Sequence, residues 1–270
     1  MNLASNEKPK GILFDLDGVF YEGSKPVPGA ASVAQWVTNQ NIPHLFLTNT
    51  TSRPRSALLS KLQQLGINTT LEHLLTPPVA AVQYLTQHLA QGSVALFVPQ
   101  ATQNEFSTLP LVKGISDEVI GAVVVGDLGK SWDYDTLNRA FRYLMQKPSP
   151  ILLSLGATRY WQNEDGLRMD VAPYVAALEC ASGIAPVVTG KPAKMFYQIA
   201  LDLLQVNASQ TLMIGDDIRG DIEGAQQAGL RAALVKTGKF RDSDLNLGIR
   251  PEVILETVCE LPGWWQANSC

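Results

Sequence analysis

Two acidic residues close the first apolar run of the chain. The run Ile12–Phe14 leads directly to Asp15, and Asp17 follows two residues later. A strand made of these apolar residues would deliver both carboxylates to its C-terminal edge, where ligands bind in open α/β sheets. Two crowded carboxylates repel each other unless a cation or a shared proton intervenes. The pair therefore indicates a hard metal ion with oxygen ligands, such as Mg2+.

Three further segments carry polar side chains directly after apolar runs. They supply Thr48 and Asn49, then Lys191 on a turn before a helix, then Asp216, Asp217 and Asp221. Taken singly, each segment is equally typical of a turn, a helix cap or a solvated side chain. Four such segments, each at the end of a predicted strand, favour one shared site.

The residue types fit phosphoryl transfer. A carboxylate cannot approach an anionic phosphate ester unaided, and a divalent cation cancels that repulsion. Asp15 can attack phosphorus to form an aspartyl-phosphate, while Asp17 can protonate the leaving group and later activate water. Lys191 adds a second cation, and we expect it to contact phosphate rather than the core. Thr48 and Asn49 can donate hydrogen bonds to the transferred group.

Short apolar runs alternate with longer amphipathic stretches along the chain. Strands are predicted at 11–16, 44–48, 93–98, 121–126, 151–155, 185–189, 211–215 and 232–236. Helices are predicted at 31–39, 53–65, 78–90, 134–146, 171–181, 193–204 and 219–228. This alternation predicts an α/β fold with a Rossmann-like parallel sheet. Cys180, inside an apolar helical pattern, is expected to be a core residue.

Two proline-containing segments, at 76–78 and 182–186, interrupt this pattern. The segments that carry chemistry all lie outside the stretch between these breaks. We therefore expect a core formed by 1–76 and 186–270, interrupted by an inserted α/β domain at 77–185. A single larger sheet is the alternative, because periodicity does not distinguish the two.

The composition of the chain argues against two classes of binding partner, nucleic acids and membranes. The chain has 270 residues and a net charge of −4, so it lacks the basic field that nucleic acid binding requires. Its apolar runs are far shorter than the roughly 20 residues of a membrane-spanning helix, which argues against a membrane partner. Three cysteines without paired spacing favour reduced thiols and a cytoplasmic location.

Together the four motifs resemble the haloacid dehalogenase superfamily of aspartate-nucleophile phosphatases, and the resemblance covers essentially the whole chain. The stretch 21–30 is similar to the branch of this superfamily with a large inserted α/β cap. The segments 153–156, 166–171 and 237–241 are similar to the phosphatases of phospholysine, phosphohistidine and pyrophosphate within that branch. The resemblance implies a phosphohydrolase that uses Mg2+.

The resemblance also implies individual roles for the acids. Asp15 would be the nucleophile and a metal ligand, and Asp17 the general acid and base, with its backbone carbonyl on the metal. Asp216 would be the third protein ligand to Mg2+. Asp217 and Asp221 would lie next to the metal ligands without binding the metal directly, or would bind it through water.

The remaining roles concern the substrate. By resemblance, Thr48 and Asn49 bind phosphate and Lys191 anchors it. The cap would exclude water and contact the leaving group; the candidate specificity residues are Arg159, Tyr160 and Arg168. The resemblance also allows a homodimer that forms through the cap.

The leading hypothesis is a Mg2+-dependent phosphatase that acts on a small phosphorylated metabolite. The alternatives are a phosphoamidate or pyrophosphate hydrolase, a sugar phosphotransferase, and a phospho-ligand sensor without turnover. Animal phospholysine phosphatases carry serine at the position of Asp17, so the acid in this chain favours ordinary phosphomonoesters. A sensor would gain nothing from Asp17.

Overall fold

A computed structural model describes residues 8–114, 118–163 and 166–267. These residues group into two compact units. The first contains the described residues within Met1–Thr48, Arg55–Leu75 and Lys191–Cys270, and the second those within Asn49–Pro54 and Thr76–Gly190. The long segment of the second unit thus interrupts the first unit in sequence. The boundaries expected for an inserted domain, 77 and 185, stay a prediction.

The first unit is built on a parallel sheet, six-stranded within the described residues, with the order β14-β13-β12-β1-β4-β5. Its strands are β1 (Gly11–Asp15), β4 (His44–Leu47), β5 (Leu74–Leu75), β12 (Thr211–Gly215), β13 (Arg231–Val235) and β14 (Val253–Leu255). The central strands β1 and β12 are buried along their whole length, which explains why they are continuous apolar runs. The predicted α/β fold is therefore confirmed.

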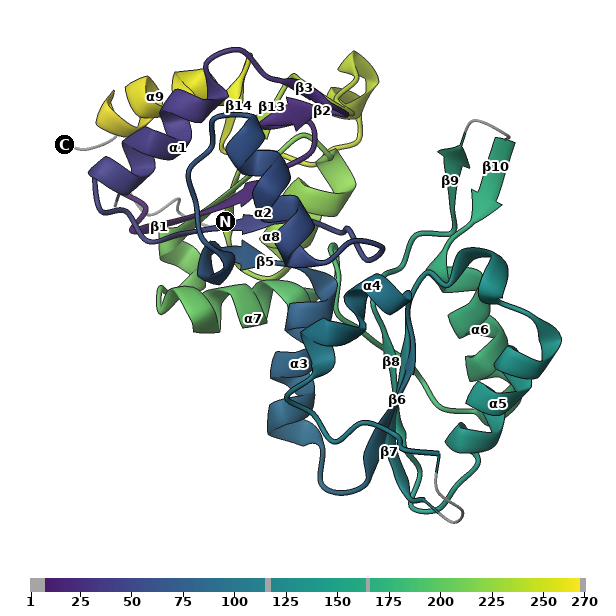
Figure 1. Ribbon diagram of the computed structural model, residues 1–270. Coiled ribbons are helices and arrows are strands. Elements are labelled where there is room, and N and C mark those ends of the chain that lie inside the picture. Colours follow the sequence, from purple (N-terminus) through teal and green to yellow (C-terminus); the bar gives the residue numbers. More distant parts are fainter. Residues whose placement is uncertain (1–7, 115–117, 164–165, 268–270) are drawn as a thin grey trace. The chain divides into compact units, whose positions relative to one another are not determined.

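Helices cover both faces of this sheet (Figure 1). They are α1 (Ala30–Asn39), α2 (Arg55–Gln64), α7 (Lys194–Leu204), α8 (Gly224–Gln227) and α9 (Leu261–Ala267). Side chains of α1, α2 and α9 pack with Ile12 and Phe14 of β1 in one hydrophobic core. A small hairpin of β2 (Tyr21–Glu22) and β3 (Lys25–Pro26) follows β1, and a π-helical turn at Ile218–Glu223 follows β12.

The second unit has its own parallel sheet, with the order β11-β8-β7-β6. Its elements are β6 (Ser93–Phe97), β7 (Ile120–Val125), β8 (Ile151–Ser154), β11 (Val187–Val188), α3 (Pro77–His88), α4 (Gln100–Gln103), α5 (Tyr134–Leu144) and α6 (Val171–Ser182). The helices α5 and α6 pack on one face and α3 on the other (Figure 1). An antiparallel hairpin joins β9 (Tyr160–Asn163) to β10 (Gly166–Met169).

Short 3-10 turns connect several of these elements, at Leu71–His73, Asn104–Phe106, Gly129–Ser131, Ala208–Gln210, Asp242–Asn246 and Val258–Glu260. Within the part of the chain that the structure describes, no helix is long and apolar enough to cross a membrane.

The prediction that Cys180 is a core residue was wrong. Its side chain is exposed, although it lies within α6 as expected. The buried positions of this helix are Val171, Val175 and Leu178. Since each helical residue turns by about 100°, Cys180 stands nine residues, or half a turn of phase, away from Val171 and faces the opposite side.

Candidate active site

The ends of three neighbouring strands converge at one edge of the first unit's sheet. Asp15, the last residue of β1, pairs in register with Leu47 of β4, and Phe14 pairs with Ile214 of β12. Thr48 and Asp216 therefore follow strand ends at the same edge as Asp15. Since ligands bind at the carboxyl ends of parallel strands, this edge is the expected position of a site.

Lys191 joins this edge from a distant part of the chain. Its Nζ lies 2.5 Å from Oδ1 of Asp15 and 2.7 Å from Oδ1 of Asp221. All three residues are buried, with Lys191 only 6% exposed. Contact with phosphate stays a prediction, but the expected contrast with a buried residue does not hold, because the Lys191 side chain is itself buried. Its stem is buried because the ammonium group must reach between two carboxylates at the sheet edge.

The two carboxylate oxygens of Asp216 differ in their hydrogen bonding. Its Oδ2 accepts a hydrogen bond of 2.7 Å from the backbone N–H of Lys239. Its buried Oδ1 accepts no hydrogen bond from any residue that the structure describes. A Cβ on Gly18 or on Gly238 would collide with the carboxylate of Asp216, and both glycines have positive φ, at 90° and 67°. The backbone therefore packs directly against this carboxylate.

Asp221 is positioned by the π-helical turn that follows β12. The turn begins after Asp217, whose Oδ1 accepts hydrogen bonds from the backbone N–H groups of Arg219 (3.1 Å) and Gly220 (2.8 Å). The hydroxyl of Tyr197 donates to the carbonyl oxygen of Gly220 at 2.8 Å. Oδ2 of Asp221 accepts from the N–H of Asp217 at 3.2 Å, so both of its oxygens have partners.

The three buried carboxylates crowd together. Asp15, Asp216 and Asp221 each offer an oxygen within 4.8 Å of the others. Burial, and then the charge of Asp15, raise the pKa of Asp216 to about 8. Burial also raises the pKa of Asp221 to about 6, although Lys191 opposes this effect. Burial disfavours the charged form of Lys191, but Asp15 and Asp221 outweigh it and raise the pKa of Lys191 above its usual range.

This arrangement fits a metal ion. Three carboxylates face a single buried ammonium group, and Oδ1 of Asp216 is buried without a hydrogen-bond donor. Carboxylate oxygens are the ligands that hard divalent cations prefer. A cation would compensate the excess negative charge and the unpaired oxygen together. The cluster could therefore hold a metal ion.

The remaining predicted site residues are not members of the three-acid cluster. The side chain of Asp17 is exposed and outside the three-acid cluster, and its Oδ1 accepts from the N–H of Gly23 at 3.4 Å. Thr48 is buried at the end of β4. Asn49 belongs to the second unit. Its Oδ1 lies close to Gly190, since a Cβ added to that glycine would be 3.1 Å from it. Asp217 is half-buried, and its Oδ2 lies 3.2 Å from Nζ of Lys239.

The predicted specificity residues lie on or beside the β9–β10 hairpin. Arg168 pairs in register with Trp161, and its guanidinium lies 6.0 Å from the centre of that ring. The guanidinium of Arg159 lies 5.9 Å from the ring of Tyr160, which is 54% exposed. The hairpin thus presents cationic and aromatic groups to solvent within the second unit.

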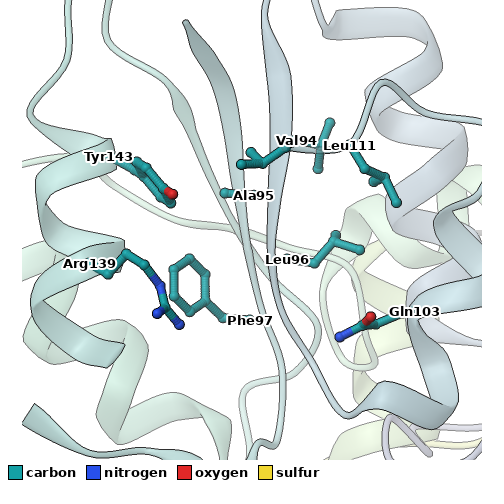
Figure 2. A pocket seen from close by; sticks show the side chains of 9 residues that line it. Val94, Ala95, Leu96, Phe97, Gln103, Leu111, Arg139 and Tyr143 are labelled. Carbon is teal, nitrogen blue, oxygen red and sulfur yellow. The ribbon is translucent and has the colours of Figure 1, made fainter. Parts of the chain in front are cut away.

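The second unit also contains a cavity of about 250 Å³ beside strand β6. Figure 2 shows Arg139 and Tyr143 of α5 on one side of the strand and Gln103 and Leu111 on the other. None of the predicted site residues lines this cavity.

Sequence reasoning missed three residues that support the acids. Tyr197 braces the turn that carries Asp221, and Lys239 holds Asp216 through its backbone N–H. Glu22 accepts a hydrogen bond of 2.7 Å from the N–H of Gly238. The Thr-Gly-Lys run at 237–239 was visible in the sequence, but its partners lie 23, 216 and 219 residues away.

Comparison with known proteins assigns the family. Residues 12–110 match the haloacid dehalogenase-like hydrolase family, and residues 188–261 match the HAD-hydrolase-like family. The human phospholysine phosphohistidine inorganic pyrophosphate phosphatase is 38% identical over 240 residues, which span 87% of this chain and 86% of the human protein.

Solved structures agree with this fold. A hypothetical protein from Pyrococcus horikoshii superimposes with a TM-score of 0.85 at 25% identity, covering 94% of this chain and 98% of its own. A 4-nitrophenylphosphatase from Thermotoga maritima gives a TM-score of 0.83 at 21% identity, covering 96% and 98%. The chain belongs to the haloacid dehalogenase-like hydrolases. Within that family it is an enzyme of the phosphohydrolase type.

Proposed function

We propose that the protein is a Mg2+-dependent phosphatase that hydrolyses a small phosphorylated compound through a phosphoaspartate on Asp15. One observation carries the proposal. The buried carboxylate of Asp15 lies 2.5 Å from a buried ammonium group and next to the carboxylate of Asp216, one oxygen of which has no partner among the described residues. This set combines a nucleophile, a cation for phosphate and a place for a metal ion.

Asp15 and Asp216 would hold Mg2+ through their side chains, and Asp17 through its backbone carbonyl. When bound, Mg2+ would supply positive charge that offsets the repulsion between the attacking carboxylate and the anionic phosphate. Both oxygens of Asp221 already accept hydrogen bonds, from Lys191 and from the N–H of Asp217. Asp221 therefore suits a supporting role, in which it orients Lys191.

In the first half-reaction, a carboxylate oxygen of Asp15 attacks phosphorus. A new bond forms between that oxygen and phosphorus, and the bond from phosphorus to the leaving-group oxygen breaks. The carboxyl group of Asp17 gives its proton to the leaving oxygen, so that an alcohol departs. The side chain of Asp17 is exposed. This position supports the role, because the substrate enters from solvent and its leaving group departs to solvent.

In the second half-reaction, Asp17 is a carboxylate and removes a proton from water. The water oxygen attacks phosphorus, and the bond between phosphorus and Asp15 breaks. The products are inorganic phosphate and the original carboxylate of Asp15. Lys191 would bind a phosphate oxygen throughout, with Thr48 and Asn49 as hydrogen-bond donors that fix the phosphoryl group for in-line attack.

Two observations support a proposal for the substrate class: the acid at Asp17 and the similarity to the human protein. Its name gives phospholysine, phosphohistidine and pyrophosphate, which makes these compounds candidates here. An acid at Asp17 supports alcohol leaving groups, because an ester oxygen is hardly protonated by water, whereas the more basic nitrogen of a P–N bond can take its proton from solvent. The second unit would act as the cap, with Arg159, Tyr160 and Arg168 near the leaving group. A cytoplasmic location and a homodimer through the cap remain predictions.

The test is phosphate release from a panel of sugar phosphates, p-nitrophenyl phosphate, phospholysine, phosphohistidine and pyrophosphate with Mg2+. We expect release that Asp15→Asn abolishes, while Asp202→Asn, the same change on an exposed acid of α7, leaves the rate unchanged. Excess EDTA should stop turnover, and added Mg2+ should restore it. Equal rates for Asp15→Asn and the unmodified protein would refute the proposal, and transfer to a sugar without phosphate release would favour a phosphotransferase.

A further inference from the structure

The segment Thr237–Lys239 follows β13 and lies against the acids of the site. Its last residue donates the backbone N–H that holds Oδ2 of Asp216, at 2.7 Å. Gly238 has a φ of 67°, and a Cβ there would meet both the carboxylate of Asp216 and the Cα of Gly18. The backbone of Gly238 therefore packs directly on Asp216, and position 238 has no room for a side chain.

The same segment also forms hydrogen bonds with the turn that carries Asp17 and with the hairpin that follows it. The hydroxyl of Thr237 donates a hydrogen bond to the carbonyl oxygen of Gly18, the residue after Asp17. The N–H of Gly238 donates to Oε1 of Glu22, on the β2–β3 hairpin, at 2.7 Å. The turn itself is closed by a hydrogen bond of 2.6 Å from the N–H of Gly18 to the carbonyl oxygen of Tyr21.

Beyond the pairing of β1 with β12 in the sheet, these contacts join the two segments that follow those strands. One carries Asp17 and the other carries Asp216, and residues 237–239 bond to both. We propose that Thr237–Lys239 is a positioning loop that sets the Asp17 turn against Asp216, so that the metal ligands are prearranged before Mg2+ binds. This inference rests on the proposed function, because it assumes that these acids bind Mg2+.

The test is Mg2+ binding to the metal-free protein, measured by isothermal titration calorimetry without substrate. Thr237→Val removes one hydroxyl and keeps the shape of the side chain. We expect the dissociation constant for Mg2+ to rise about fivefold, the effect of one net hydrogen bond. At saturating Mg2+, kcat should return to within about twofold of the unmodified protein, because the loop acts on the metal ligands rather than on the chemical step.

Thr211→Val is the matched control. Thr211 is buried, and its hydroxyl also donates to a backbone carbonyl, that of Asn207, at 3.0 Å. It begins β12, at the end of the strand opposite Asp216. Both variants should lose some thermal stability, but only Thr237→Val should weaken Mg2+ binding. A purely structural role of Thr237 predicts equal Mg2+ affinity in the two variants.

A second pair of variants covers the possibility that Thr237→Val does not fold. Glu22→Gln keeps an oxygen that can accept from Gly238, whereas Glu22→Ala removes it. We expect weaker Mg2+ binding in Glu22→Ala and near-normal binding in Glu22→Gln. If the unmodified protein binds no Mg2+, the proposed function fails. If it binds Mg2+ and both Thr237→Val and Glu22→Ala bind it equally well, the positioning loop is refuted while the proposed function stands.

Discussion

Nζ of Lys191 lies 2.5 Å from Oδ1 of Asp15, although 176 residues separate them in sequence. Both side chains are buried, and Lys191 also bonds to the buried Asp221. The lysine thus compensates two carboxylates that would otherwise repel each other. This relationship means that Lys191 supports the fold of the site as well as the proposed binding of phosphate.

Replacing Lys191 with methionine should therefore affect both activity and stability. We expect kcat/KM to fall about 100- to 1000-fold, as when a preorganised donor to the reacting group is lost. The metal-free variant should also lose about 3–5 kcal/mol of unfolding free energy, because two buried carboxylates lose their counter-charge. Urea denaturation with and without Mg2+ measures this loss.

Lys236→Met is the control for that experiment. Lys236 pairs with Glu256 at 2.5 Å, but both residues are exposed, with the side chains 36% and 67% accessible. Exposed pairs contribute little because water screens them, so stability and kcat/KM should stay unchanged. Comparable losses in the two variants would contradict the role assigned to the buried lysine.

The role of Asp17 as an acid predicts a dependence on the leaving group. An alkyl phosphate has a poor leaving group that needs a proton, whereas p-nitrophenolate leaves readily without one. Asp17→Asn should lower kcat/KM for an alkyl phosphate about 1000-fold, within the usual range for general acid catalysis. The loss for p-nitrophenyl phosphate should be less than about tenfold, since kcat/KM reports the step that expels the leaving group.

Asp15→Asn provides the comparison, because loss of the nucleophile should remove activity toward both esters equally. Steady-state kinetics on the two substrates, for both variants, checks this prediction. An equal proportional loss for the two esters in Asp17→Asn would show that Asp17 does not donate the proton.

His44 makes the stability of the first unit sensitive to acid. Its buried ring stacks on His73 with centroids 4.7 Å apart, and Nδ1 lies 2.8 Å from the carbonyl oxygen of Ile42. Burial lowers the pKa of His44, and the charge of His73 lowers it further. The fold therefore favours the neutral ring. Below about pH 6.5, the usual pKa of histidine, the unfolded chain takes up a proton at His44 more readily than the folded chain does.

It follows that this contribution to stability is present above pH 6.5 and is lost as the pH falls below it. Thermal unfolding between pH 7.5 and 5 should show a steeper decline for the unmodified protein than for His44→Asn. His88→Asn, the same change at an exposed histidine of α3, should retain the steep decline. A parallel decline in the unmodified protein and His44→Asn would remove His44 as the cause.

The sequence was sufficient to predict the strand ends that carry Asp15, Thr48 and Asp216. These strands are buried on both faces, so they appear as continuous apolar runs, and the polar residue that ends each run marks the sheet edge. Their meeting at one edge follows from parallel topology. This is why local patterns were informative about the site.

Contacts across the chain could not be predicted in the same way. The burial of Lys191 depends on partners 30 and 176 residues away, and the bond between Glu22 and Gly238 spans 216 residues. The two-residue strands β2 and β3 are too short to give a periodic pattern. The position of Asp221 depends on a π-helical turn, which an apolar period of 3.6 does not reveal.

The most direct test of the account is to trap the phosphoryl group on Asp15. An aspartyl-phosphate is reduced by borohydride to homoserine, which mass spectrometry of the digested protein can locate. We predict homoserine at position 15 when substrate and Mg2+ are present, and none when Asp15 is replaced by asparagine. Rapid turnover with an unmodified Asp15, or trapping at a different residue, would contradict the proposed mechanism.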